Sequence, residues 1–229
     1  MDNNNYIKIS KTALRNFIDN NDKTLCVLLY LCFHQTCNAE IYTSIDCICT
    51  ELNLSLKSHG ERRNQNVIKD ILSNLIDDQI ISFINTNYCD RFETIKNNQL
   101  FKIKFNPESS IFNISYGYVI INNEEYKKLF NIKNANLYKH INAYCYLKSY
   151  ICMDEKCLHI CYPTLKTLSN NLKCSNKTLS SLLRDLYASK LIYIYKFDTD
   201  TLPNTRYTFE YVFSIEKYTK DDIYKELSA

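Results

Sequence analysis

The sequence predicts an α+β, helix-rich chain made of two copies of one unit, each with a helix pair and a β-hairpin. Apolar segments recur in the same order in both halves, with helical spacing of three and four residues, and alternating strands close each half. A length of 229 residues accommodates two domains of ordinary size. The turn-forming segment 106–110 places the expected boundary between domains 1–113 and 114–229.

Three sequence matches define the repeat. In the first match, an apolar strand followed by a polar cap in one half aligns with the same pattern in the other half. In the other two matches, the apolar faces of helices align. The second match has an offset of 120 residues and the third an offset of 111, so the first copy has nine more residues between its two helices. Unrelated amphipathic helices also align well, but three matches in one order favour duplication. The matched segments are 6–10 with 118–122, 42–52 with 162–172, and 68–81 with 179–192.

Each copy is expected to contain a lead helix, a short strand, two helices joined by a tight connection, and a hairpin. The lead helices are predicted from apolar runs, and the hairpins from alternation such as Phe101, Ile103 and Phe105 against two lysines. In the first copy we expect a helix over 24–35, a strand at 40–42, helices from Thr43 to before Ile80, and strands over 80–88 and 99–105. In the second we expect a helix over 136–150, a strand at 158–162, helices from Thr164 to before Leu191, and strands over 191–197 and 206–213.

The segment 214–229 is predicted to form a charged C-terminal helix with Ile215, Tyr218, Ile223 and Leu227 as its apolar residues. We expect this helix to pack on its own domain, and a second subunit is the alternative.

This order of elements is that of a winged helix, and the second half resembles the winged-helix class of helix-turn-helix proteins. The resemblance rests on the segments TLKTLSNNL at 164–172, KCS at 173–175 and NKTLSSLLRDL at 176–186. It implies two winged-helix domains in tandem, with the second helix of each pair in the major groove and the hairpin, or wing, on the flanking backbone. Such tandem proteins are similar to replication initiators of plasmids and phages from A/T-rich Gram-positive bacteria, and to two-domain transcriptional regulators.

The second helix of the second copy has a polar face suited to DNA. Ser175 is a good N-cap, and the leucines at 179, 182, 183 and 186 bury the opposite face. An amide can pair with adenine, an Arg with guanine, and Lys or Ser with phosphates. A solvated face of a core helix is the alternative. The candidate DNA-binding residues are Lys173, Ser175, Asn176, Lys177, Ser180, Ser181 and Arg184.

The first copy offers a related but less basic surface. Its candidates are Arg62, Arg63, Asn64, Gln65, Asn66 and Lys69. Asp70, Asp77 and Asp78 follow on the same helix and disfavour phosphate contact. The candidate wing residues are Arg91, Lys96, Lys102 and Lys104 in the first copy, and Lys196 and Arg206 in the second.

The distribution of charge also favours the second half. The net charge of the chain is +3. Residues 1–113 contain 12 basic and 13 acidic residues, whereas residues 114–229 contain 16 and 12. The respective net charges are −1 and +4, so any attraction to a polyanion is expected to be stronger in the second half.

Signals for enzymatic chemistry are weak, and we expect no catalytic residue, metal or cofactor. The four histidines are isolated, there is no P-loop, and nothing resembles an acyl-transfer nucleophile motif. Cys152, Cys157, His159 and Cys161 have ligand-like chemistry, which leaves a zinc site open as an alternative. However, alternate side chains of one strand seldom converge on a single ion, so partly buried reduced thiols are the preferred interpretation.

A cytoplasmic protein is expected. No apolar run reaches the roughly 20 residues that span a bilayer, and residues 1–5 lack the features of a signal peptide. The eleven cysteines then indicate reduced thiols.

The sequence predicts a non-enzymatic, sequence-specific double-stranded DNA-binding protein that serves replication initiation or transcription regulation. The alternative is a protein-interaction or dimerisation module built on winged helices. Double-stranded DNA is the expected partner, with no membrane and no small-molecule substrate. The oligomeric state is left open, a homodimer included.

Overall fold

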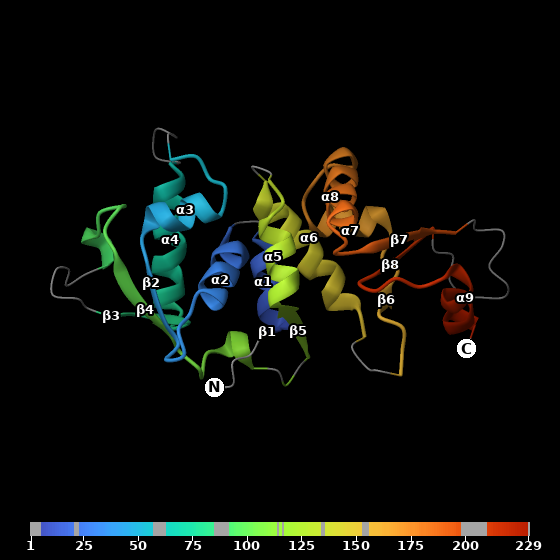
Figure 1. Cartoon of the computed structure of the whole chain (residues 1–229), viewed down its shortest axis with the longest axis horizontal. Helices are drawn as coiled ribbons and strands as arrows, with labels where there is room; N and C mark the ends of the chain where they lie inside the picture. Colours follow the sequence, from blue (N-terminus) through green and yellow to red (C-terminus); the bar gives the residue numbers. More distant parts are fainter. Residues whose placement is uncertain are drawn as a thin grey trace. The chain divides into compact units, whose positions relative to one another are not determined.

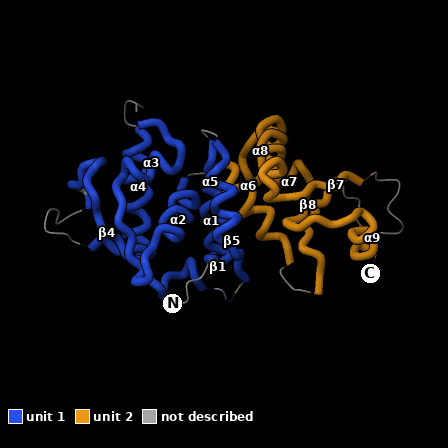
Figure 2. The backbone as a smooth tube through the Cα atoms, viewed as in Figure 1, with its two compact units in different colours: residues 1–138 blue, residues 139–229 orange. Residues whose placement is uncertain are grey.

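The protein is a helix-rich α+β chain with small antiparallel sheets (Figure 1). The computed structural model describes residues 6–20, 23–56, 63–84, 92–113, 115, 117–133, 136–152, 156–197 and 210–228. The chain forms two compact units, residues 1–138 and residues 139–229 (Figure 2). Within the described part, every helix is too short or too polar to cross a bilayer.

Two strand–helix segments from distant parts of the sequence pair in unit 1. They are β1 (Tyr6–Ser10) with α1 (Lys11–Asp19), and β5 (Tyr118–Asn122) with α5 (Asn123–Phe130). Strands β1 and β5 are antiparallel, with Lys8 opposite Ile120. These two residues are also equivalent in the repeat, so the matched strands pair symmetrically about their centres. The pairing explains why the division between the units falls after Tyr138 and not after Asn113 as expected, since β5 and α5 belong with β1.

The rest of unit 1 is a helical cluster on a three-stranded sheet. Its elements are α2 (Thr24–Phe33), β2 (Glu40–Thr43), α3 (Ile45–Glu51), α4 (Asn64–Asp77), β3 (Ile81–Ile84), η1 (Phe92–Thr94), β4 (Phe101–Phe105) and η2 (Ser110–Phe112). Residues 25–32 of α2 are all buried, as expected for a helix that is apolar on every side. The strand order is β2-β4-β3, and Phe101, Ile103 and Phe105 of β4 face the core.

Unit 2 repeats this arrangement. Its elements are α6 (Leu137–Tyr150, which begins at the end of unit 1), β6 (Ile160–Cys161), α7 (Leu165–Asn171), α8 (Asn176–Ala188), β7 (Tyr193–Lys196), β8 (Tyr211–Ser214) and α9 (Lys220–Ser228). The strand order is β6-β8-β7, so in both units the last strand of the hairpin lies in the centre of the sheet. Strands β4, β6 and β7 are shorter than the sequence predicts, and β2 is one residue longer. Most of the rest of the predicted ranges of β3 and β8 falls in the segments 85–91 and 198–209, which lie outside the described residues.

The helix ends provide an independent sign of the repeat. Asn53 and Lys173 follow α3 and α7 with left-handed backbone, at φ 54° and 47°. Gln79 and Lys190 follow α4 and α8 in the same way, at φ 55° and 54°. In all four places the next residue donates its N–H to a carbonyl five residues earlier, as in a Schellman cap. These positions have the same offsets, 120 and 111, as the apolar pattern.

The C-terminal helix α9 packs on its own unit, as the sequence predicts, but it begins at Lys220 and not at residue 214, because Ser214 ends strand β8. Ile223 is fully buried in a cluster with Ile160, Phe197 and Val212, and Leu227 packs against it. Lys220 donates from Nζ to the Lys196 carbonyl oxygen at 2.8 Å. Helix α9 therefore packs against the β7–β8 hairpin where β7 ends.

Candidate nucleic-acid interface

Helix α8 begins at a side-chain cap and exposes one polar face. The Ser175 hydroxyl oxygen accepts the Thr178 N–H at 3.2 Å, which confirms the predicted N-cap. The four predicted leucines are buried. The opposite face is exposed, together with the turn before the helix. The exposed candidates are Lys173, Ser175, Asn176, Lys177, Ser180, Ser181 and Arg184.

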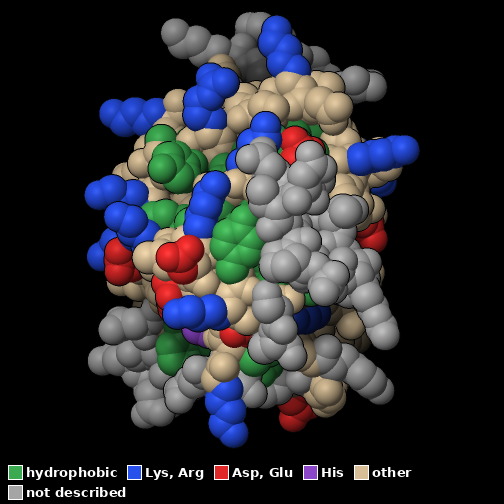
Figure 3. Space-filling model, turned by 90° about the vertical axis from the view of Figure 1, so that its right-hand side faces the viewer, with side chains coloured by type: hydrophobic (Ala, Val, Ile, Leu, Met, Phe, Trp, Pro, Cys, Tyr) green, Lys and Arg blue, Asp and Glu red, His purple; other side chains and the backbone are tan. Residues whose placement is uncertain are grey.

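The exposed face of α8 is polar and cationic. Lys177 and Arg184 are on it, and the only acidic residue of the helix, Asp185, is bound elsewhere. The His140 Nε2 on α6 lies 2.9 Å from Asp185 Oδ2, and the imidazole is only 1% exposed. Figure 3 views the molecule from the right-hand side of Figure 1, and Lys and Arg side chains project mainly from the upper part of this face.

The side chains of this surface carry groups that are chemically suited to base edges and phosphates. The Asn176 amide can donate to and accept from a base, and the Arg184 guanidinium suits guanine or phosphate. The first turn of α8 adds the partial positive charge of a helix N-terminus. The Ser180 hydroxyl donates to the Asn176 carbonyl oxygen at 2.9 Å, so its lone pairs remain as acceptors.

The equivalent helix of unit 1, α4, is arranged differently. Gln65 is buried, with 2% exposure, and its Nε2 donates to Asp46 Oδ1 at 3.1 Å. Its Oε1 accepts from Arg63 Nε. Lys69 donates from Nζ to the Ile95 carbonyl oxygen at 2.7 Å, and Asn64 donates from Nδ2 to the Ser55 carbonyl oxygen at 2.9 Å.

The expectation that the polar run opening α4 faces a duplex is therefore not met at Gln65, and Arg63, Asn64 and Lys69 are half-buried. Gln65 lies three residues before Ile68 and seven before Leu72, so its place on the apolar stripe was visible in the sequence. The exposed residues of α4 are Asn66, Asp70, Asn74 and Asp77, followed by Asp78. This surface is acidic and repels phosphates.

The wing candidates differ in their exposure and in their contacts. Lys96 and Lys104 of unit 1 and Lys196 of unit 2 are exposed. Lys102 forms an ion pair with Glu40 at 2.8 Å, which lowers the pKa of the Glu40 carboxyl. Arg62, Arg91 and Arg206 lie outside the described residues.

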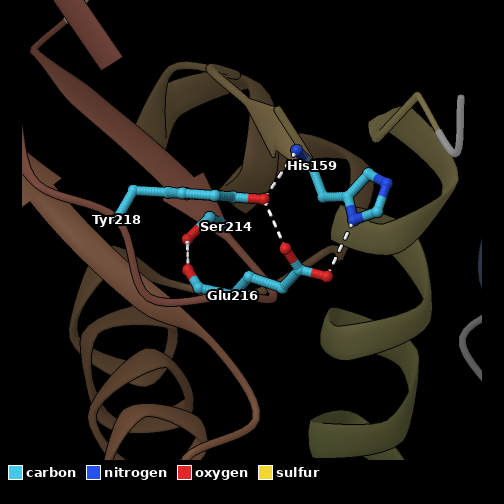
Figure 4. A network of polar contacts seen from close by, with 4 residues as sticks. All are labelled: His159, Ser214, Glu216 and Tyr218. Carbon is cyan, nitrogen blue, oxygen red and sulfur yellow. Dashed lines mark hydrogen bonds and ion pairs between the residues drawn. The ribbon is translucent and has the colours of Figure 1, made fainter. Parts of the chain in front are cut away.

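The cysteine–histidine cluster is divided between two environments, and Figure 4 shows that of His159, beside Glu216 and Tyr218. His159 Nδ1 lies 3.0 Å from Glu216 Oε1, and the Tyr218 hydroxyl donates to Glu216 Oε2 at 2.6 Å. The hydrogen bonds from Tyr218 and His159 lower the pKa of the Glu216 carboxyl. Cys152, Cys157 and Cys161 instead line a cavity of about 520 Å³. Among the residues with described positions, no group of three or more potential ligands could hold a metal ion.

Sequence reasoning missed an exposed residue of the α8 surface, Tyr187, and a buried residue behind it, His140. Tyr187 is 53% exposed and continues the stripe three residues after Arg184, a spacing that the sequence does show. His140, which binds Asp185 across 45 positions, has no such local signal.

Comparisons of the sequence with protein-family models and with curated proteins find no match.

Proposed function

We propose that the chain is a non-enzymatic, sequence-specific double-stranded DNA-binding protein built from two winged-helix domains in tandem. Helix α8 is the reading element, and the β7–β8 hairpin lies on the flanking backbone. One observation carries this proposal: the exposed face of α8 combines an amide, hydroxyls and two cations, while its only carboxylate is bound to a buried imidazole.

The repeated architecture supports the winged-helix assignment. Both units contain a strand, two helices and a hairpin in the same order, and both sheets have the same strand order. The left-handed residues after α3, α4, α7 and α8 recur at matching positions. Two helices joined by a short turn and followed by a hairpin are the elements that a winged helix requires.

The biological role that fits is recognition of a replication origin or of an operator in the cytoplasm. Neither requires a cofactor or a catalytic group in this chain. An initiator of this kind would recruit a separate helicase, because the sequence contains no P-loop.

The acidic face of α4 favours a second role for unit 1. Asp70, Asp77 and Asp78 are exposed there, and Lys69 is bonded to Ile95. A surface of this kind suits contact with protein better than contact with DNA. Unit 1 is therefore the candidate dimerisation or protein-interaction module, and unit 2 the DNA reader.

Fluorescence anisotropy with duplexes from the DNA flanking the gene tests this function. We expect the logarithm of affinity to fall with the logarithm of salt concentration, by about 0.9 per phosphate contacted. A shuffled duplex should bind more weakly. Absence of binding at low salt, or binding that salt does not affect, would contradict DNA binding.

A double variant, Lys177→Ala with Arg184→Ala, tests the assignment to α8. We expect about tenfold to hundredfold weaker binding, from the loss of a base contact and a phosphate contact. Lys127→Ala with Lys225→Ala removes the same charge from exposed positions on α5 and α9 and is the matched control. Equal effects of the two double variants would remove α8 from the interface.

A further inference from the structure

Asp185 of the exposed helix α8 is paired with the buried imidazole of His140. Asp185 follows Arg184 directly, and its side chain is 34% exposed. The His140 side chain is 1% exposed and comes from α6, which forms part of the core of unit 2. The Nε2–Oδ2 distance of 2.9 Å is that of a hydrogen bond in which the imidazole N–H donates to the carboxylate.

We propose that His140 is a positioning residue for DNA binding, which turns the Asp185 carboxylate toward the core and keeps it out of the cationic stripe of α8. This inference rests on the proposed function of α8 as the reading helix. It assigns a binding role to a buried residue that cannot itself contact a duplex.

The physical reason is the repulsion between a carboxylate and phosphates. Without the imidazole, the partly exposed carboxylate of Asp185 is free to rotate into solvent beside Arg184. Two like charges about 4 Å apart repel each other by about 1 kcal/mol when water surrounds them, which is about a fivefold change in affinity. The same carboxylate satisfies the imidazole N–H, so the pair serves both the core and the surface.

The test uses three variants of the full chain. His140→Phe removes the donor and keeps an aromatic ring. Asp185→Asn removes the charge and keeps an oxygen that can accept from the imidazole. The double variant has neither the donor nor the charge. Anisotropy over a salt series with a labelled A/T-rich duplex measures affinity and its salt slope, and circular dichroism follows folding.

We expect His140→Phe to weaken binding about fivefold and Asp185→Asn to bind at least as tightly as the wild type. Adding Asp185→Asn to His140→Phe should restore affinity, because the exposed charge is then absent. A purely structural role predicts instead that the double variant stays as weak as His140→Phe, and that result would overturn the inference.

Two further outcomes separate this inference from the proposed function. If the wild type binds no DNA, the function of α8 itself fails. If the wild type binds and all three variants match it, only the role of His140 fails. If His140→Phe unfolds, Asp185→Asn still tests the inference. Weaker DNA binding by folded Asp185→Asn would contradict the idea that the Asp185 carboxylate opposes binding.

Discussion

The amide nitrogen of Gln65 on α4 donates a 3.1 Å hydrogen bond to the carboxylate of Asp46 on α3. In unit 1 this bond ties the start of α4 to α3 through polar side chains. In unit 2 the start of α8 remains exposed. The same architecture therefore presents two different surfaces.

The two helices should respond differently to loss of their polar groups. Asn66→Ala with Lys69→Ala is expected to leave DNA affinity within about twofold, because Lys69 is bonded to the Ile95 carbonyl and α4 is acidic. Loss of that bond should lower the free energy of unfolding by about 1 kcal/mol. Anisotropy and urea denaturation measure the two effects, and a loss of affinity as large as that of the α8 double variant would place α4 on DNA.

Substitutions of Ser175 can separate the effect of the N-cap on stability from the effect of charge at the start of α8 on DNA affinity. Ser175→Ala should lower the free energy of unfolding by about 1 kcal/mol, since the Thr178 N–H loses its acceptor. Ser175→Asp retains a good cap but brings a carboxylate to the helix N-terminus, so stability should be kept while DNA affinity falls. Denaturation and anisotropy on both variants provide the check. Wild-type affinity in Ser175→Asp would exclude the start of α8 from the interface.

Helix α9 is expected to be essential for the stability of unit 2. Ile223→Ala creates a cavity in a fully buried cluster and should cost about 2–4 kcal/mol. Lys225→Ala, at an exposed position of the same helix, should stay within about 0.5 kcal/mol of the wild type. Urea denaturation followed by circular dichroism compares them. Similar midpoints for the two variants would show that α9 contributes little.

Buried thiols should make the protein sensitive to alkali. Burial raises the pKa of Cys49 to about 11 and that of Cys161 to about 12, from an ordinary value of 9.0. A raised pKa in the folded state stabilises the protein below about pH 9, and this contribution is lost as the pH rises through 11 and 12. Thermal denaturation across this range should show falling stability.

Alkylation with mass spectrometry provides a second measure of the same thiols. In the native protein, iodoacetamide should modify the exposed Cys37, Cys47, Cys152 and Cys157 first, and Cys49 and Cys161 only after unfolding. Rapid native labelling of Cys161 would contradict the burial that raises its pKa.

Much of the local structure followed from the sequence. The cap at Ser175, the buried leucines of α8 and the packing of the C-terminal helix were all predicted and are confirmed. Helix periodicity and capping depend on neighbours within one or two turns, which a sequence displays directly. The left-handed residues at 53, 79, 173 and 190 were not predicted, because none of them is glycine.

The sequence by itself determined the repeat, the order of the lead helix, helix pair and hairpin in each half, and the polar face of α8, but it did not predict helices α1 and α5. Only the tertiary structure decided that β5 pairs with β1, that Gln65 turns inward to Asp46, and that Asp185 is held by His140. Periodicity shows which side chains share a face of a helix. It does not show which polar groups will find partners on another element, because those contacts form between residues that folding alone brings together.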